Sequence, residues 1–168
     1  MNVGELMTRG VKTCALGDSL NRAAQLLWDN DCGCIPVVDP EGKAIAMITD
    51  RDICMAAYTQ GQALGNMLVS SAASREIVTV GEAESLDVAE ALMQEHQIRR
   101  LPVVDAVGKP IGLVSMNDLA RRANSEGFKH HDDLSAEGIV KTLAAVCEPA
   151  HEPLGAPPRA TQQVRAAE

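Results

Sequence analysis

The feature that most constrains this chain is an internal repeat. The segment Ile35–Asp39 reads IPVVD and recurs as LPVVD at Leu101–Asp105, 66 positions later. The same register holds without a gap between residues 13–57 and residues 79–123. Chance similarity does not keep one register over so long a span, so we interpret the chain as a tandem duplication. A unit of this size cannot bury its apolar surface alone, whereas two units packed together can.

Each copy predicts the same order of elements: strand, helix, strand, strand, helix. Hydroxyl side chains that can cap a helix precede the expected helices: Ser19 and Ser85 before the first helix of each copy, and Thr49 and Ser115 before the second. Gly42 and Gly108 lie in expected hairpin turns, where a positive φ is needed. The return strands are expected at 44–48 and 110–114, and the second helices end near Ala57 and Ala123.

The pattern predicts an α/β (α+β) fold in which two βαββα repeats pack sheet to sheet with pseudo-twofold symmetry. We expect the first repeat at 1–60, the second at 61–124, a linker and C-terminal helix at 125–147 and a disordered tail at 148–168. Ile139, Leu143 and Val146 give that helix its apolar spacing, and Pro and Ala dominate the tail. Apolar residues on the outer helices predict a twofold homodimer: Leu26, Leu27, Trp28, Leu92 and Met93.

Composition excludes several partners. Only 2% of the residues are aromatic and the net charge is -8, which disfavours base stacking and nucleic-acid binding through the overall field. No apolar run suits a membrane span and no export signal stands out, so we expect no membrane association and a cytoplasmic location. Five cysteines are an odd number, which fits reduced thiols better than a disulfide framework.

Both copies resemble CBS domains, the modules named after cystathionine beta-synthase, and the pair resembles a Bateman module of the stand-alone bacterial type. Residues 34–39 and 48–52 carry the match in the first copy, and residues 100–105 and 114–118 carry it in the second. The resemblance covers about residues 1–124. It implies a regulatory module that binds AMP, ADP, ATP or an S-adenosylmethionine-like ligand between the copies, has no obligatory cofactor and signals to a downstream protein that the sequence does not identify.

The resemblance also implies roles for the Thr/Ser-x-x-Asp segment that starts each second helix. The Asp would take the ribose hydroxyls and the Thr or Ser would face the phosphate. These roles agree with elementary chemistry, because a helix N-terminus suits phosphate and a carboxylate can accept from two hydroxyls. The Pro-flanked strands would offer an apolar slot for a purine, and nearby arginines would neutralise phosphate. The candidate ligand-binding residues are Thr13, Cys34, Ile35, Pro36, Thr49, Asp50, Arg51, Asp52, Thr79, Arg99, Arg100, Leu101, Pro102, Ser115, Met116, Asn117 and Asp118.

Plainer interpretations of these residues stay open. Asp52 and Asp118 could simply support a helix N-terminus, and the arginine pair at 99–100 could be ordinary surface charge. The copies differ where ligand contacts are expected, since Asp-Arg at 50–51 corresponds to Met-Asn at 116–117. The two clefts are therefore chemically unequal, and one could be empty or take a different ligand.

Metal and catalytic sites find little support. Cys32-x-Cys34 and the segment His130–Asp133 carry metal-binding atoms, but a tetrahedral zinc site needs two more ligands at suitable spacing. A core thiol and a solvated linker are the favoured interpretations, and we predict no metal. No phosphate-cradling Gly-rich loop or nucleophile elbow is present, and His96 stands outside the repeated motif. We therefore predict no catalytic residue and no enzymatic activity.

Three functions remain in competition. The first is a sensor of adenosine nucleotides. The second is a dimerisation or protein-interaction module with vestigial pockets. The third is a redox or metal sensor that uses Cys32 or Cys34, for which no charged partner is evident in the sequence.

Overall fold

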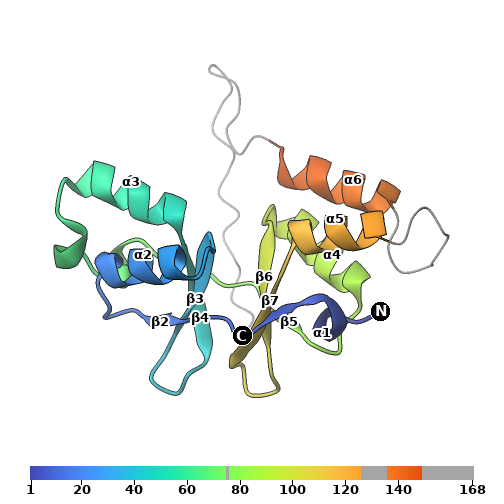
Figure 1. Ribbon diagram of the computed structural model, residues 1–168, viewed down its shortest axis with the longest axis horizontal. Coiled ribbons are helices and arrows are strands. Elements are labelled where there is room, and N and C mark those ends of the chain that lie inside the picture. Colours follow the sequence, from blue (N-terminus) through green and yellow to red (C-terminus); the bar gives the residue numbers. More distant parts are fainter. Residues whose placement is uncertain (75, 126–135, 149–168) are drawn as a thin grey trace, which may run out of the picture.

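The two copies form two small sheets that lie next to each other in the middle of the molecule, with the helices on the outer sides (Figure 1). The computed structural model describes residues 1–74, 76–125 and 136–148. The first sheet has the order β2-β3-β4, with β2 (Cys14–Ala15), β3 (Cys34–Val38) and β4 (Ala44–Thr49). The second has the order β1-β7-β6-β5, with β1 (Thr8–Arg9), β5 (Val80–Gly81), β6 (Arg100–Val104) and β7 (Pro110–Ser115).

Helices cover one face of each sheet. The first sheet carries α2 (Leu20–Asp29) and α3 (Asp50–Gln60), and the second carries α4 (Leu86–His96) and α5 (Met116–Ser125). A further helix, α6 (Ala136–Val146), packs on α4 and α5. Short turns open each repeat: α1 (Val3–Leu6) before the first, and the 3-10 turns η1 (Leu64–Asn66) and η2 (Val69–Ser71) before the second. The predicted fold of two βαββα repeats with paired sheets is confirmed.

Local chemistry starts and stops these elements as the sequence predicts. Ser19 Oγ accepts a hydrogen bond from the Arg22 amide at 3.2 Å, and Ser85 Oγ accepts one from the Val88 amide at 3.3 Å. These bonds satisfy an N-terminal amide that has no partner within its helix. The hairpin glycines Gly42 and Gly108 adopt φ values of 83° and 86°.

The segment that opens each repeat packs against the other repeat. Strand β1 pairs with β7 in antiparallel register, and the Val3 amide donates to the Glu84 carbonyl at 2.9 Å. In the opposite direction, the Leu20 amide donates to the Met67 carbonyl at 2.8 Å. Gly112 permits this exchange on the second sheet, because a Cβ atom there would collide with the side chain of Met7. The crossed segments tie the two repeats into one unit.

Each repeat has its own hydrophobic core, which lies between its sheet and its helices. Leu27 and Met93, which the sequence suggests as outward apolar residues, are 5% and 0% exposed and belong to these cores. The helical face predicted for the C-terminal helix is also corrected, because Leu143 is 48% exposed. Trp28 is 87% exposed, in agreement with the expected outer surface.

The C-terminal helix is present as α6, and Ile139 and Val146 join the second core. The predicted tail at 148–168 lies outside the described residues from position 149 onward, as does the segment His130–Asp133. None of the helices in the described part of the chain has the length and hydropathy that a membrane span requires.

Candidate functional site

The Thr-x-x-Asp segment of the first repeat forms a reciprocal cap at the start of α3. Asp52 Oδ2 accepts from the Thr49 amide at 2.9 Å and from Thr49 Oγ1 at 2.7 Å. The Asp52 amide in turn donates to Thr49 Oγ1 at 3.1 Å. One carboxylate oxygen therefore supports the helix, as the plainer interpretation expects. The other oxygen, Asp52 Oδ1, has no donor among the described residues.

The Ser-x-x-Asp segment of the second repeat forms the same cap but uses both oxygens. Asp118 Oδ2 accepts from the Ser115 amide at 2.9 Å and from Ser115 Oγ at 2.6 Å. Asp118 Oδ1 accepts from the guanidinium of Arg121 and forms an ion pair with it. The position equivalent to Arg121 in the first repeat is Met55, which cannot donate. Both carboxylate oxygens of Asp118 thus accept from protein groups, whereas Asp52 keeps one oxygen that can accept from a ligand.

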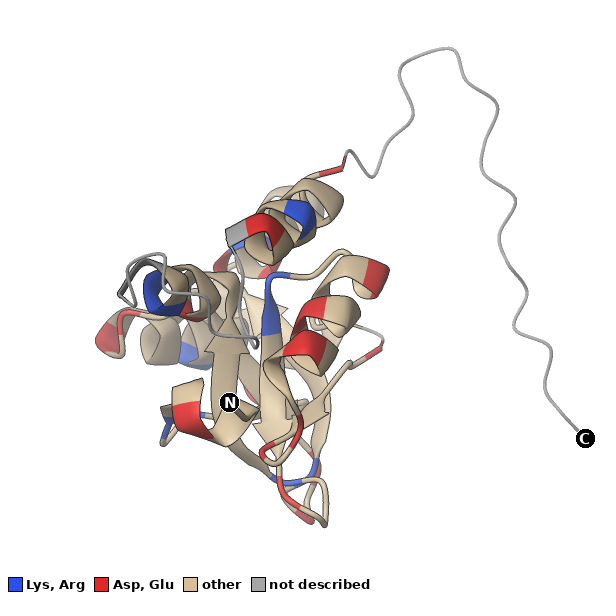
Figure 2. Cartoon of the chain, turned by 90° about the vertical axis from the view of Figure 1, so that its right-hand side faces the viewer, with Lys and Arg blue, Asp and Glu red and all other residues tan. Residues whose placement is uncertain are grey.

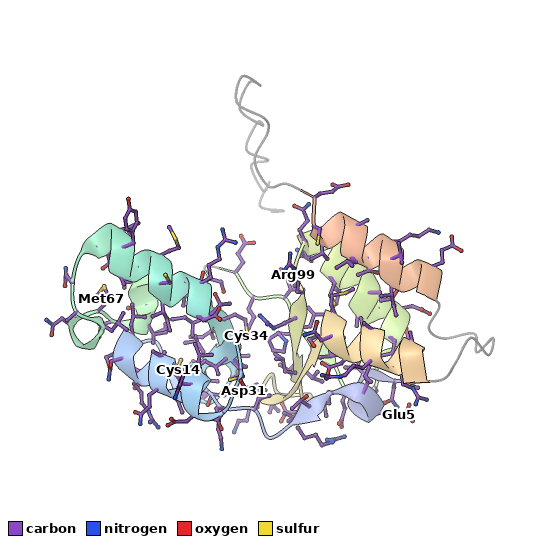
Figure 3. The ribbon with its side chains drawn as sticks, turned by 45° about the horizontal axis from the view of Figure 1, so that its top comes forward. Glu5, Cys14, Asp31, Cys34, Met67 and Arg99 are labelled. Carbon is purple, nitrogen blue, oxygen red and sulfur yellow. The ribbon has the colours of Figure 1, made fainter. Side chains whose placement is uncertain are left out.

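Arg100 brings positive charge from the second repeat to the first. It follows Arg99 and begins β6, and its guanidinium lies close enough to the thiol of Cys34, which begins β3, to lower the pKa of that thiol. Figure 3 shows Arg99 and Cys34 on the sides of the two repeats that lie toward each other. Its Nη2 atom lies 3.2 Å from where a Cβ atom of Gly33 would be, and Asp50 Oδ2 lies 3.5 Å from the same point. The absence of a side chain at Gly33 therefore leaves room for a cation, a carboxylate and a thiol to gather.

The remaining candidates fall into three groups, in the cores, near the strands and at the helix starts. Ile35, Leu101 and Met116 are buried in the two cores, so their side chains support the strands and α5. Near the strands, Thr13 and Thr79 immediately precede β2 and β5, which pair in parallel with β3 and β6, and Pro36 and Pro102 are buried within those partners. At the helix starts, Arg51 and Asn117 are exposed.

Arg99 points to a different neighbour. Its Nη2 atom donates to Cys147 Sγ, just beyond α6, at 3.6 Å. The arginine pair is therefore divided, with Arg100 at the first repeat and Arg99 at the C-terminal helix. The sequence analysis did not identify Arg121 as a partner of Asp118, although a basic residue three positions after an acidic one on a helix is a recognisable signal.

Burial raises the pKa of three thiols of the first repeat, those of Cys14, Cys32 and Cys34. Burial, with a smaller contribution from the nearby Asp18 carboxylate, raises the pKa of Cys14 to about 11. Burial likewise raises the pKa of Cys34 to about 11, although Arg100 acts in the opposite direction. The pKa of Cys32 is also raised, chiefly by burial. Since the thiolate is the reactive form, these environments disfavour redox sensing by the three buried or half-buried thiols.

Ligating and charged groups are spread out over the described residues. Within the described ranges no cluster of three or more His, Cys, Asp or Glu side chains could hold a metal ion. Basic residues are scattered over the face shown in Figure 2, where acidic residues line several helices and loops. The arrangement suits a small ligand held by a few specific groups better than a polyanion held by a broad basic surface.

Comparison with known proteins gives the geometry a family context. Residues 3–58 and 69–125 each match the model of the CBS domain. The CBS domain-containing protein YhcV of Bacillus subtilis (strain 168) is 40% identical over 119 residues, which cover 71% of this chain and 83% of that protein.

Two solved structures with bound adenosine compounds have the same fold. The CBS domain pair of protein MJ0100, in complex with 5'-methylthioadenosine and S-adenosyl-L-methionine, superposes with a TM-score of 0.68 at 25% identity, covering 75% of this chain and 98% of that one. CBSX2 in complex with AMP gives a TM-score of 0.64 at 27% identity, covering 74% and 97%. The two matched repeats, the paired sheets and these relatives show that the chain belongs to the CBS domain family and contains a pair of such domains.

Proposed function

We propose that this protein is a regulatory module that binds an adenosine nucleotide or an S-adenosylmethionine-like ligand between its repeats and signals to a partner protein. The observation that carries the proposal is the group at the start of α3. Asp52 Oδ1 retains an acceptor there, and Arg100 supplies a cation from the other repeat within reach of Gly33 and Asp50. The two related domain pairs with bound adenosine compounds support the choice of ligand class.

The chemistry of the first repeat fits the parts of such a ligand. Asp52 accepts from ribose hydroxyls with its open oxygen, while its other oxygen keeps the cap of α3 intact. Thr49 and the first amides of α3 lie on the phosphate side, where the helix N-terminus favours negative charge. Pro36, in β3, and Thr13, immediately before the paired strand β2, border the purine. Arg51 and Arg100 balance the phosphate charge.

The second repeat holds the weaker site in this proposal. Arg121 already neutralises Asp118, so a ribose must displace an ion pair before it gains the same bonds. Pro102, Thr79 and Asn117 provide the corresponding positions, with no cation in place of Arg51. We therefore propose unequal occupancy, with the first site filled at lower ligand concentration.

Calorimetric titration of the whole chain with AMP, ADP, ATP and S-adenosylmethionine tests the function. We expect binding of at least one ligand with a dissociation constant in the micromolar range, which corresponds to about -8 kcal/mol. Guanosine nucleotides serve as the matched control, because they keep the ribose and phosphates and change only the base. The absence of heat from all four adenosine ligands would overturn the proposal.

The same proposal includes a homodimer, a cytoplasmic location and the absence of catalysis.

A specific observation favours a second candidate function, that of a protein-interaction module. The first repeat exposes Trp28 (87%), Tyr58 (83%) and Met55 (49%) on its outer helices, which is a large apolar surface for one small repeat. Binding of a partner there is compatible with ligand sensing, since a module that signals needs such a surface.

A further inference from the structure

The C-terminal helix α6 packs on a surface of the second repeat, called its seat below, whose polar contacts come from Glu90, Gln94, Gln97 and Arg99. Gln94 Nε2 donates to Thr142 Oγ1 at 2.7 Å, and Thr142 Oγ1 lies 3.4 Å from Glu90 Oε2. Gln97 Nε2 donates to the Ala145 carbonyl at 3.2 Å. With the bond from Arg99 to Cys147, four residues of α4 and the segment after it hold the C-terminal half of α6.

The first repeat has the same seat, and no described segment covers it. The repeat offset of 66 relates the four residues that hold α6 to Ala24, Trp28, Asp31 and Gly33. All four line a pocket of about 360 Å³ on the first repeat. The other four lining residues, Leu27, Cys32, Asp50 and Ile53, correspond to Met93, Ile98, Met116 and Leu119, which pack in the same core cluster as Ile139 and Val146 of α6. All eight residues that line the pocket therefore correspond to residues that hydrogen-bond to α6 or share its core cluster.

The seat on the first repeat is the more apolar of the two. Glu90 and Gln94, which hydrogen-bond to α6 in the second repeat, are replaced by Ala24 and Trp28. The exposed residues Cys54, Met55 and Tyr58 lie on α3, the helix that also contributes Asp50 and Ile53 to the pocket. An exposed apolar patch of this kind marks a binding surface, and its shape in the second repeat is that of a helix seat.

Helix α6 also has a second apolar face. Its inner face, with Ile139, Thr142 and Val146, is buried on the second repeat. Val140 (64% exposed), Leu143 (48% exposed), Ala144 and Cys147 follow the spacing i, i+3, i+4, i+7 and form an exposed stripe. Each chain therefore has one uncovered seat and one uncovered helix stripe.

We propose that the exposed stripe of α6 from a second copy of this chain occupies the seat formed by α2 and α3 of the first repeat. This inference rests on the homodimer proposed above and names the surface that forms it. In Figure 1, α3 and α6 both lie along the top, one over each repeat, so a second copy turned by a twofold axis places its α6 on this α3 and the reverse. Two identical contacts form and no seat is left over, as a closed twofold dimer requires.

Sedimentation of two charged variants tests the contact. Trp28→Asp damages the seat and Leu143→Lys damages the stripe, and both side chains are exposed enough for the fold to persist, which circular dichroism checks. We expect the wild type to be a dimer and each variant to dissociate with a constant raised roughly thirtyfold or more, as for central interface residues. Val107→Asp, at a 58% exposed apolar residue in the hairpin between β6 and β7, is the matched control and should remain dimeric.

Mixing the two variants tests the pairing itself. A mixed pair has one intact contact and one contact between Asp and Lys, so an equimolar mixture should form heterodimers although neither variant dimerises alone. A dimer that survives Leu143→Lys, or a mixture without heterodimers, overturns the inference while the nucleotide titration is unaffected. A monomeric wild type at tens of micromolar overturns both this inference and the proposed homodimer.

Discussion

The two repeats share one backbone plan and differ in how completely that plan is closed. The second repeat is sealed by α6, and its Asp118 is neutralised by Arg121. The first repeat has an uncovered helix seat, and its Asp52 keeps an open oxygen. Duplication gives two equivalent backbones, and substitutions at a few equivalent positions then change which contacts each repeat leaves open. In the function proposed above, the first repeat has the stronger ligand site and the open surface, while α6 and Arg121 close the second repeat.

The largest expected effect concerns the seal on the second repeat. Ile139→Ala removes a buried side chain between α6 and the second core, and should lower the free energy of unfolding by about 2–4 kcal/mol. Lys141→Ala is the control on the same helix, because this side chain is exposed outside the proposed stripe and makes only a surface ion pair with Glu137, so the substitution should change stability by about 0.5 kcal/mol or less. Urea denaturation measures both. Equal effects of the two substitutions would mean that α6 does not seal the second repeat.

A related truncation separates α6 from the residues that follow it. Removal of residues 149–168 should leave the melting temperature within a few degrees, because the sequence there lacks apolar periodicity. Removal of residues 126–168 takes α6 away as well and should cause a much larger decrease. Differential scanning calorimetry compares the two truncated chains, and a similar decrease in both would contradict the expected division of roles.

The buried thiols distinguish the first repeat at alkaline pH. The pKa of Cys14 and of Cys34 is about 11 in the folded chain, against 9.0 for an ordinary thiol. Between these values the unfolded chain has lost the thiol protons and the folded chain retains them, so stability falls as the pH rises from about 9 to about 11. At about 1.4 kcal/mol for each unit of pKa, titration of the two thiols should lower the free energy of unfolding by a few kcal/mol over this pH range.

Cys14→Val tests this pH dependence with the residue that the second repeat uses at the equivalent position, Val80. Denaturation at pH 8 and at pH 10.5 should show a smaller loss of stability in the variant than in the wild type. Titration of Lys and Tyr is common to both proteins and cancels in the difference. A variant that loses as much stability as the wild type would show that the buried thiol is not responsible.

The sequence predicted what is local and repeated. Caps at Ser19 and Thr49, positive φ at Gly42 and the order of strands and helices follow from near neighbours, and each prediction was made twice because the unit is duplicated. The exchange of opening segments was not predicted, because alignment of the copies places Val3 with the first repeat, whereas in space it belongs to the second core. Periodicity on one helix cannot indicate which distant sheet it meets.

The candidate site divides in the same way. The caps of Asp52 and Asp118 follow from spacing alone, whereas the approach of Arg100 to Cys34 depends on how the two sheets face each other. Helical spacing puts Leu27 on one face of α2 with Leu20 and Ala23, and all three are buried, so only the additional assignment of Leu27 to the outer dimer surface was wrong. The seat of α6 could be identified only from the sequence and the structure together, because the repeat offset points to the equivalent surface only after the contacts of α6 are known.

Ligand affinity provides a direct comparison of the two capping carboxylates. Asp52→Asn keeps the shape of the side chain but removes the charge that strengthens a ribose hydrogen bond, and should weaken binding roughly ten- to hundredfold, or about 1.5–3 kcal/mol. Asp118→Asn should weaken the same binding event by roughly threefold or less, because Arg121 already occupies that carboxylate. Calorimetry with the ligand that binds the wild type measures both variants, and equal losses would contradict the ranking.

The smallest expected effect concerns Glu90, the position at which the second seat is polar and the first has Ala24. Glu90 is 8% exposed, and Oε1 has no hydrogen-bond partner among the described residues. Burial raises the pKa of this carboxyl and the Asp87 charge adds to the effect, whereas the Thr142 hydroxyl opposes it. The folded chain therefore binds the proton more tightly than the unfolded chain does, so stability falls as the pH rises from about 4.5 through the raised pKa. Glu90→Gln keeps the shape and the contact with Thr142 without the buried charge, and should stabilise the protein at pH 7 by about 1 kcal/mol with a flatter pH dependence. Glu95→Gln, at an exposed position on the same helix, is the control and should leave both quantities unchanged. Denaturation at pH 5 and at pH 7 measures the difference, and a loss of stability in Glu90→Gln at pH 7 would mean that the charged carboxylate contributes to the seat of α6 after all.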